Sequence, residues 1–339
     1  MTINELDHVS GEPLPSNGVS YEALTVLRLA FATDDKPDAV FQQPVQSTNK
    51  KTLSNKCEIM AARLKVWTAG LLEVRGSETA HVEVSGVFVP KPHAKIQYLH
   101  RTVRDFLEKR DEWDKIVSRT KGTSFEPYSA LLGAAILELK TSSAGMWPEL
   151  APLLTFAMHA GFVTGHANTK LLDELDRVME FQFRTQRQED GLHWANYDTI
   201  HTLNPKYQHD SFLSLAVQFS LWGYIQEKLK GNKYLLVNSR GRPLLDSAVN
   251  PISVNKCYPV SCKVVEVLLH HGADPMAKFC NQTAGDQAVR WHHATVTSPK
   301  SAMEIFEESE LWTSESSDRA ANAIPRILVA MKKDLDFPI

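Results

Sequence analysis

His100 is the residue whose type and position are most suggestive of chemistry. Residues 96–100 alternate between apolar and polar side chains as a strand does, and residues 103–107 switch to the spacing of a helix face. An imidazole at such a junction can donate or accept a hydrogen bond, and its charge changes near neutral pH. The sequence alone favours a structural hydrogen-bonding role for His100.

The cysteines offer a second candidate chemistry. Four residues separate Cys257 from Cys262, and Cys280 and the pair His292-His293 follow. This spacing matches no standard zinc finger, so buried thiols are favoured and no metal site is predicted. Four cysteines in 339 residues form no disulfide framework either, which indicates a reducing compartment.

The sequence lacks the motifs of the common catalytic classes. It contains no phosphate-binding Gly-x-x-x-x-Gly-Lys-Ser/Thr, no Gly-x-Gly-x-x-Gly, no Gly-x-Ser-x-Gly and no His-Glu-x-x-His. These absences weigh against a self-contained NTPase, hydrolase or zinc protease. The sequence therefore predicts no enzyme, no catalytic residue and no cofactor, with an unrecognised enzyme site as an alternative.

A basic helix is the candidate nucleic-acid site. Its cations are Lys50, Lys51, Lys56, Arg63 and Lys65. Winged helices can place such a helix in the DNA major groove. However, Glu58 and the expected buried-face residues Met60, Leu64 and Trp67 interleave, and the formal net charge is −3. A solvated helix face is favoured, and a DNA-associated regulator is the alternative.

The elements that must position these residues indicate a mainly α protein that begins with a winged-helix-like α/β module. Residues 1–18 are polar and predict a disordered leader, and the module is expected over residues 19–120. Periodicity predicts helices over residues 24–31 and 53–69, and strands of a short antiparallel sheet over 71–74, 82–84 and 96–99. A helical connector over residues 121–190 follows, with helices expected over 127–140, 147–160 and 170–183.

Internal similarity predicts a short, irregular ankyrin-like repeat stack with C-terminal capping helices over residues 191–339. Leu213 and Leu244 occupy similar positions at an offset of 31 residues, and ankyrin repeats have a period of about 33. Gly272 is expected to end a helix in the left-handed conformation before a turn at Asp274. A degenerate third unit would have a helix capped by Thr283, and residues 324–331 would close the stack.

Repeat stacks of this kind present surfaces and turns to other proteins. The predicted partner-binding residues of this chain are Ser214, Leu245, Asp246 and Asp274.

Residues 20 to 335 resemble the region that follows the ATPase in fungal NACHT-type proteins, which are STAND NTPases related to the NOD-like receptors. The Tyr-x-His-x-x-Val-x-Asp-Phe-Leu pattern at residues 98–107 is similar to the aromatic-x-His-x-x-Phe-x-Glu-Phe-Leu motif of their winged helices. The other matching signatures are the ankyrin-like units and residues 37–40, 57–65, 70–74 and 171–176.

The resemblance implies signal-responsive assembly, including non-self recognition and cell-death control. In that family the motif histidine contacts the phosphates of bound ADP. Since this chain contains no phosphate loop, His100 is a candidate ADP-phosphate contact only with an external NACHT domain. The resemblance also implies that the chain is truncated or split from its ATPase.

Composition completes the prediction. Apolar residues make up 43% and charged residues 23%, and no run approaches the roughly 18 apolar residues of a membrane span. We therefore expect a soluble, cytoplasmic protein without membrane or nucleic-acid partners. Its predicted function is non-catalytic protein–protein interaction and signal sensing, and its predicted partners are proteins, among them a NACHT ATPase domain in trans.

Overall fold

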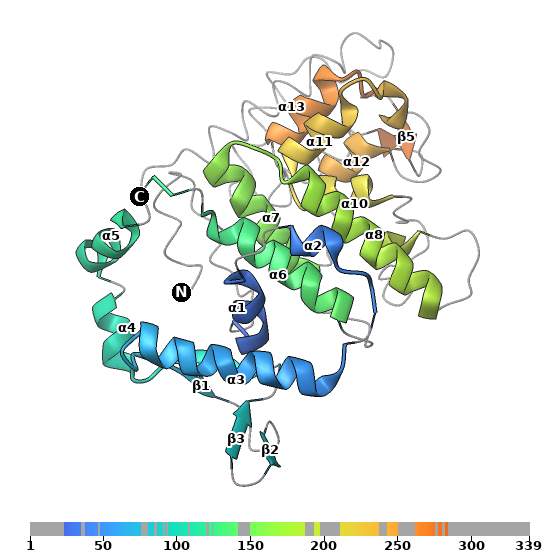
Figure 1. The fold of residues 1–339 in the computed structure, drawn as a ribbon. Coiled ribbons are helices and arrows are strands. Elements are labelled where there is room, and N and C mark those ends of the chain that lie inside the picture. The colour runs from blue at the N-terminus through green and yellow to red at the C-terminus, as the bar shows by residue number, and fades with distance from the viewer. Residues whose placement is uncertain are drawn as a thin grey trace. The chain divides into compact units, whose positions relative to one another are not determined.

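The computed structural model forms two compact units, residues 1–186 and residues 187–339, and its described part is mainly helical (Figure 1). No helix among the described residues is long and apolar enough to cross a membrane. The described residues are 24–34, 38–46, 48–75, 81–84, 87–90, 92, 94–107, 109–119, 122–123, 125–141, 150–186, 193–196, 211–236, 243–249, 262–274, 277–279 and 282–283.

Unit 1 begins with two helices that bury one face each, as the periodicity predicts. The N-terminal end of α1 (Val26–Ala32) is capped by Thr25, whose hydroxyl oxygen accepts a hydrogen bond from the Arg28 amide. The longer α3 (Lys50–Trp67) packs against α1. Between them lies α2 (Ala39–Gln42), which the sequence did not predict because four residues are too short to show a period.

The strands of unit 1 form two separate antiparallel pairs rather than one short sheet. β1 (Leu72–Arg75) pairs with β4 (Lys95–Tyr98), and β2 (His81–Val84) pairs with β3 (Val87–Pro90). The expected strands are therefore confirmed, whereas β3 was missed. On its other edge β4 meets the segment before α1, because the amides of Val26 and Ile96 donate to the carbonyls of Ala94 and Leu24.

Five further helices lie among the described residues of unit 1, and the three predicted for the connector are confirmed. They are α4 (Arg101–Leu107), α5 (Arg110–Ser118), α6 (Pro127–Thr141), α7 (Leu150–Thr164) and α8 (Thr169–Gln186). Helix α6 is the centre of the unit and packs against α1, α2, α7 and α8 (Figure 1). The segments expected as a winged-helix-like module and as a connector thus share one core.

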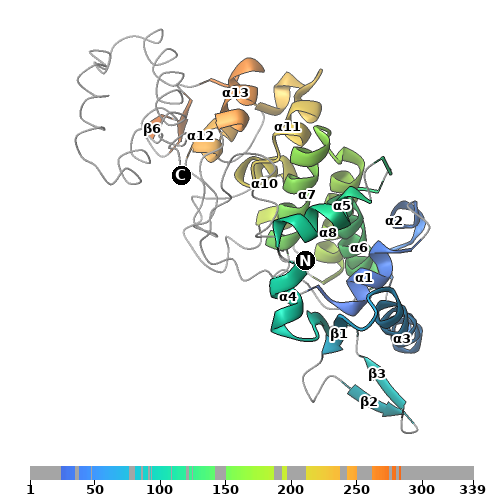
Figure 2. The same cartoon turned by 90° about the vertical axis from the view of Figure 1, so that its left-hand side faces the viewer.

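Unit 2 contains two successive helix hairpins. The first is α10 (Phe212–Gln218) with α11 (Trp222–Leu229), and the second is α12 (Leu244–Val249) with α13 (Cys262–His270). Helix α10 packs on α12 and α11 packs on α13, so equivalent helices are neighbours (Figure 2). Gly272 follows α13 with a φ of +92°, which confirms the predicted left-handed terminus.

The remaining described elements of unit 2 are short. They are the 3₁₀ helices η4 (Trp194–Asn196) and η6 (Lys233–Leu236) and the strands β5 (Lys278–Phe279) and β6 (Gln282–Thr283). Thr283, the expected helix cap, pairs with Lys278 at the end of β6. The leader, the helix expected after Thr283 and the predicted closing segment at 324–331 lie outside the described residues.

Candidate functional site

His100 caps the helix that follows it. Its ring Nδ1 accepts a hydrogen bond from the Thr102 amide at 3.2 Å and lies 2.9 Å from the Thr102 hydroxyl oxygen, and its carbonyl accepts from the Val103 amide. An accepting Nδ1 assigns the ring proton to Nε2. The structural hydrogen-bonding role favoured from the sequence is therefore present. The side chain is exposed, so Nε2–H is open to a ligand supplied from outside.

The apolar face of α4 is not buried as an amphipathic helix would require. None of the described residues of this helix is buried, and Leu99 and Phe106 are about half exposed. Arg101 and Asp105 form an exposed i,i+4 ion pair at 3.7 Å. The element that carries His100 is thus held mainly by its cap and its link to β4.

The cations of α3 do not form a uniform basic surface. Lys56 pairs with Asp34 at 2.8 Å and lies 5.0 Å from the centre of the Phe31 ring, so it ties α3 to the end of α1. The Arg63 guanidinium lies 5.9 Å from the centre of the Trp67 ring. Lys50, Lys51 and Lys65 are exposed.

The expected buried face of α3 needs one correction. Met60 and Leu64 are buried, but Trp67 is 60% exposed. Trp67 is the last residue of α3, and the chain turns away directly after it. The rest of the core therefore does not reach over its ring.

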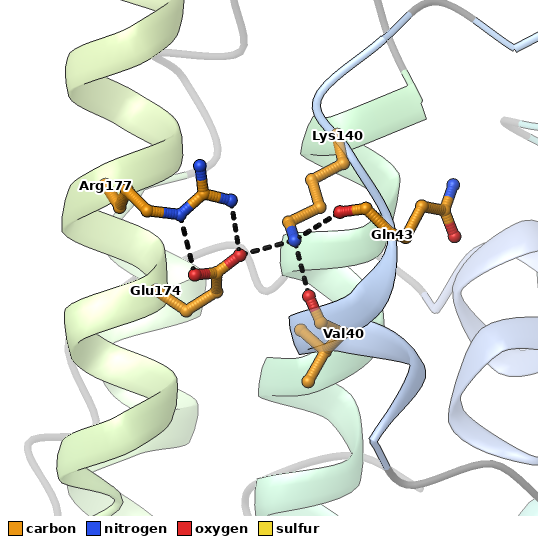
Figure 3. A network of polar contacts seen from close by, with 5 residues as sticks. All are labelled: Val40, Gln43, Lys140, Glu174 and Arg177. Carbon is orange, nitrogen blue, oxygen red and sulfur yellow. Dashed lines mark hydrogen bonds and ion pairs between the residues drawn. The ribbon is translucent and has the colours of Figure 1, made fainter.

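The most deeply buried charge of unit 1 is Lys140, near the end of α6 (Figure 3). Its ammonium group donates to the carbonyls of Val40 and Gln43, the latter at 2.7 Å, and forms an ion pair with Glu174. The guanidinium of Arg177 binds both oxygens of Glu174 at 2.7 and 2.8 Å. This cluster joins α2, α6 and α8.

The electrostatics of the cluster stabilise its charged form. Burial acts to raise the pKa of Glu174, but the hydrogen bonds from Arg177 and Lys140 outweigh it and hold that pKa below the ordinary value. Backbone bonds extend the connection, since the Gln46 and Thr48 amides donate to the carbonyls at the end of α6. With every ammonium proton directed at protein oxygen, the cluster is a structural clamp.

A second buried ion pair lies on the other side of α6. The Arg28 guanidinium binds Glu138 at 2.8 and 3.0 Å, and both side chains are almost completely buried. Burial, reinforced by the negative charge of Glu138, raises the pKa of the Cys57 thiol to about 12. At neutral pH Cys57 is a protonated, inert thiol.

His159 of α7 is a buried imidazole. Its ring stacks on Tyr128 of α6 with the ring centres 5.0 Å apart, and its Nε2 atom has no hydrogen-bond partner in the described part of the chain. Burial lowers the pKa of His159 to about 4, so the ring is neutral at physiological pH. It serves as an aromatic core residue in this state.

In unit 2 the predicted partner-binding residues are divided between core and surface. Ser214, Leu245 and Asp246 are buried, so these three side chains cannot touch a partner and that expectation is corrected. The physical reason is that α10 and α12 pack on each other and are covered on most of their surfaces. Asp274 is exposed, as a turn residue after α13.

Sequence reasoning missed the aromatic core of unit 2. Trp194 is completely buried and lies 5.8 Å from Phe212, whose ring meets Tyr224 edge-on at 5.4 Å. It also missed the buried charges Glu138 and Lys140, although a glutamate and a lysine within the largely apolar run of residues 132–141 were a signal that they are buried with partners.

Among the described residues, no group of three or more histidine, cysteine or acidic side chains is placed to hold a metal ion. Cys257, Cys280 and the His292-His293 pair lie outside them.

Comparison with known proteins adds one match. A family model described as a domain of unknown function (DUF7791) matches residues 11–146, which is less than half of the chain. No curated protein and no solved structure matches the chain. The matched segment ends after α6 and before α7.

Proposed function

We propose that this chain is a non-catalytic protein–protein interaction and signal-sensing region related to the part of fungal NACHT-type receptors that follows the ATPase. The observation that carries the proposal is the packing of equivalent helices in unit 2, α10 on α12 and α11 on α13. Stacked helix hairpins at a sequence offset near 31 residues are what an ankyrin-like array requires. Such arrays act by binding other proteins.

The geometry of His100 is compatible with the same proposal. In its inferred tautomer the exposed imidazole offers an Nε2–H donor while Nδ1 is occupied by the helix cap. A phosphate held by an ATPase domain, on the same polypeptide or on another, could accept from that donor. His100 would then report the nucleotide state of that domain to α4.

Photo-crosslinking tests the interaction function. A photoreactive amino acid placed at exposed Asp274 or Lys263 of unit 2 should give discrete adducts with a protein partner in cells. The matched position is exposed Lys170 on α8 of unit 1, where we expect no such adduct. Equal adduct patterns at all three positions, or none at Asp274 and Lys263, would refute the assignment to unit 2.

Nucleotide titration tests the non-catalytic part of the proposal. Calorimetry with ADP or ATP should show no binding to the chain alone. When the chain is joined to a NACHT ATPase domain, His100→Ala should lower ADP affinity, whereas Lys170→Ala should not. Measurable nucleotide binding by the chain alone would favour the enzyme alternative instead.

A further inference from the structure

The outer face of α3 carries an exposed apolar stripe. Ile59, Ala62 and Val66 follow one another at i, i+3 and i+7, which places them on one side of the helix. Ile59 is 54% exposed and Val66 is 77% exposed, whereas the opposite side buries Met60 and Leu64. Helix α3 is therefore apolar on two faces, one buried in the core and one exposed. In Figures 1 and 2 it lies at the edge of unit 1.

The stripe continues at the C-terminal end of α3. Trp67 is 60% exposed, and the Arg63 guanidinium lies over its ring. Leu71 and Leu99, also exposed, are adjacent there, because the Leu99 amide donates to the Leu71 carbonyl at 2.9 Å. Several large exposed apolar side chains in one region are typical of interaction sites.

The charges beside the stripe specify the kind of partner. Lys51, Arg63 and Lys65 are exposed and form no ion pair with another described residue. The ammonium group of Lys56 is paired with Asp34. Glu58 is the one acidic residue in the sequence of α3, against five basic residues. An apolar stripe flanked by exposed cations is complementary to a helix that has apolar residues at the same spacing and acidic residues beside them.

We infer that the outer face of α3 docks an acidic amphipathic helix of a partner protein. The stripe from Ile59 to Val66 rises about 10 Å, so two to three turns of such a helix would cover it. A nucleic acid fits less well, because the centre of the face is apolar and phosphates need cations there. A second copy of α3 fits less well too, since its cations would face these cations. The inference does not depend on the function proposed for unit 2.

A peptide-binding experiment with the full chain tests this inference. The probe is a synthetic helical peptide with leucines at i, i+3 and i+7 and flanking glutamates, followed by fluorescence anisotropy. We expect saturable binding that weakens as NaCl rises from about 50 mM to about 500 mM. Two comparison peptides are used. One has lysine in place of each glutamate, and the other has the same residues as the acidic peptide in scrambled order. Both should bind at least about tenfold more weakly than the acidic peptide.

Two variants and one control locate the site. Val66→Glu puts a carboxylate in the stripe and should weaken binding at least about tenfold. Arg63→Glu should also weaken it, and should improve binding of the lysine peptide by charge reversal. Val163→Glu changes an equally apolar residue of α7 that is 57% exposed, and should leave binding unchanged. Circular dichroism checks that all three variants fold.

Other occupants give different results, each of which overturns the inference. Equal binding of the scrambled peptide, or equal weakening by Val163→Glu, would show nonspecific adhesion. Retardation of duplex DNA that Arg63→Glu abolishes, without peptide binding, would assign the face to nucleic acid. A dimer that Val66→Glu dissociates would assign it to a second copy. An Ala62→Cys thiol that maleimide cannot reach in the isolated chain would show that the chain covers its own α3.

Discussion

Single charged residues inside unit 1 determine how its helices are held together. Lys140 and the pair Arg28–Glu138 lie on α6 or against it, and all three side chains are nearly inaccessible to water. Transferring charges into an interior costs free energy, which close partners offset only when the geometry is complete. Lys140 has two carbonyls and a carboxylate as partners, so the loss of its ammonium group takes a buried donor from both carbonyls and leaves the carboxylate with Arg177 alone.

Replacing Lys140 by Met should destabilise unit 1 by about 3 kcal/mol or more. The carbonyls of Val40 and Gln43 would lose their buried donor, and Glu174 would keep only the more exposed Arg177 as its cation. Urea unfolding measures this change in the free energy of unfolding. The control is Arg177→Met, which removes the more exposed partner of the same carboxylate and should cost only about 1 kcal/mol. If both variants lost the same stability, the clamp would not centre on Lys140.

His159 should make stability depend on pH. The folded-state pKa is lowered to about 4 from the ordinary 6.5, so the unfolded chain binds more protons between these values. The unfolding free energy should therefore be full above pH 6.5 and fall as the pH drops toward 4, by about 3 kcal/mol in all. Urea unfolding of wild type and His159→Phe across this range isolates the effect, since phenylalanine can still stack on Tyr128. Identical pH profiles would contradict it.

At the scale of elements, the sequence predicted the long helices. It missed helix α2 and strand β3, and it did not predict that two large apolar side chains are exposed. Helix α8 has 18 residues with a clear apolar period, and α6 has 15 residues that are apolar on most sides, so both are long enough to be recognised as helices. Helix α2 has four residues, too few to show a helical period, and strand β3 is an apolar run that ends in Pro90 and shows no alternation. Periodicity also marks an apolar face without saying whether a neighbour covers it, which is why Trp67 and Phe106 were expected inside and lie exposed.

For the candidate site residues, the sequence predicted the local secondary structure but not the burial of the side chains. The position of His100 between a strand and a helix follows from the change of period at that residue, and the structure confirms it. The burial of Ser214 and Asp246 did not follow, because it depends on which faces of α10 and α12 meet. Tertiary packing of this kind joins residues far apart in the chain, and local patterns carry no information on it.

The cap formed by His100 should control the stability of α4. His100→Ala removes the acceptor for the Thr102 amide and should destabilise this helix by about 1 kcal/mol. His100→Asn offers a short side-chain acceptor, which is favoured at helix caps, and should restore most of that loss. Hydrogen exchange measured over residues 101–107 reads the effect locally. Faster exchange in the alanine variant but not in the asparagine variant is the expected result, whereas equal exchange in both would mean that the ring does not cap α4.

At the scale of the whole molecule, the boundary of unit 1 differs from that of the matched family segment. The match to the domain of unknown function ends at residue 146, whereas unit 1 extends to residue 186. Helix α6 lies at the end of the match, and its residues 134–141 are all buried. Part of that burial comes from α7 and α8, and α8 also supplies Glu174 to Lys140.

We therefore expect that residues 11–146 alone do not form a stable domain, and that residues 1–186 do. In the shorter fragment the apolar surface of α6 that faces α7 and α8 would be exposed to water, and Lys140 would lose its carboxylate. Both losses act on the central helix, so the whole fragment should be affected. Size-exclusion chromatography and near-ultraviolet circular dichroism should show an aggregated or loosely packed 11–146 fragment, while residues 1–186 should unfold cooperatively in urea. Two results together would contradict this expectation. The 11–146 fragment would unfold cooperatively, and Lys140→Met would lower its unfolding free energy by no more than Arg177→Met lowers that of residues 1–186. In that case α7 and α8 would be additions to a complete domain rather than part of its core.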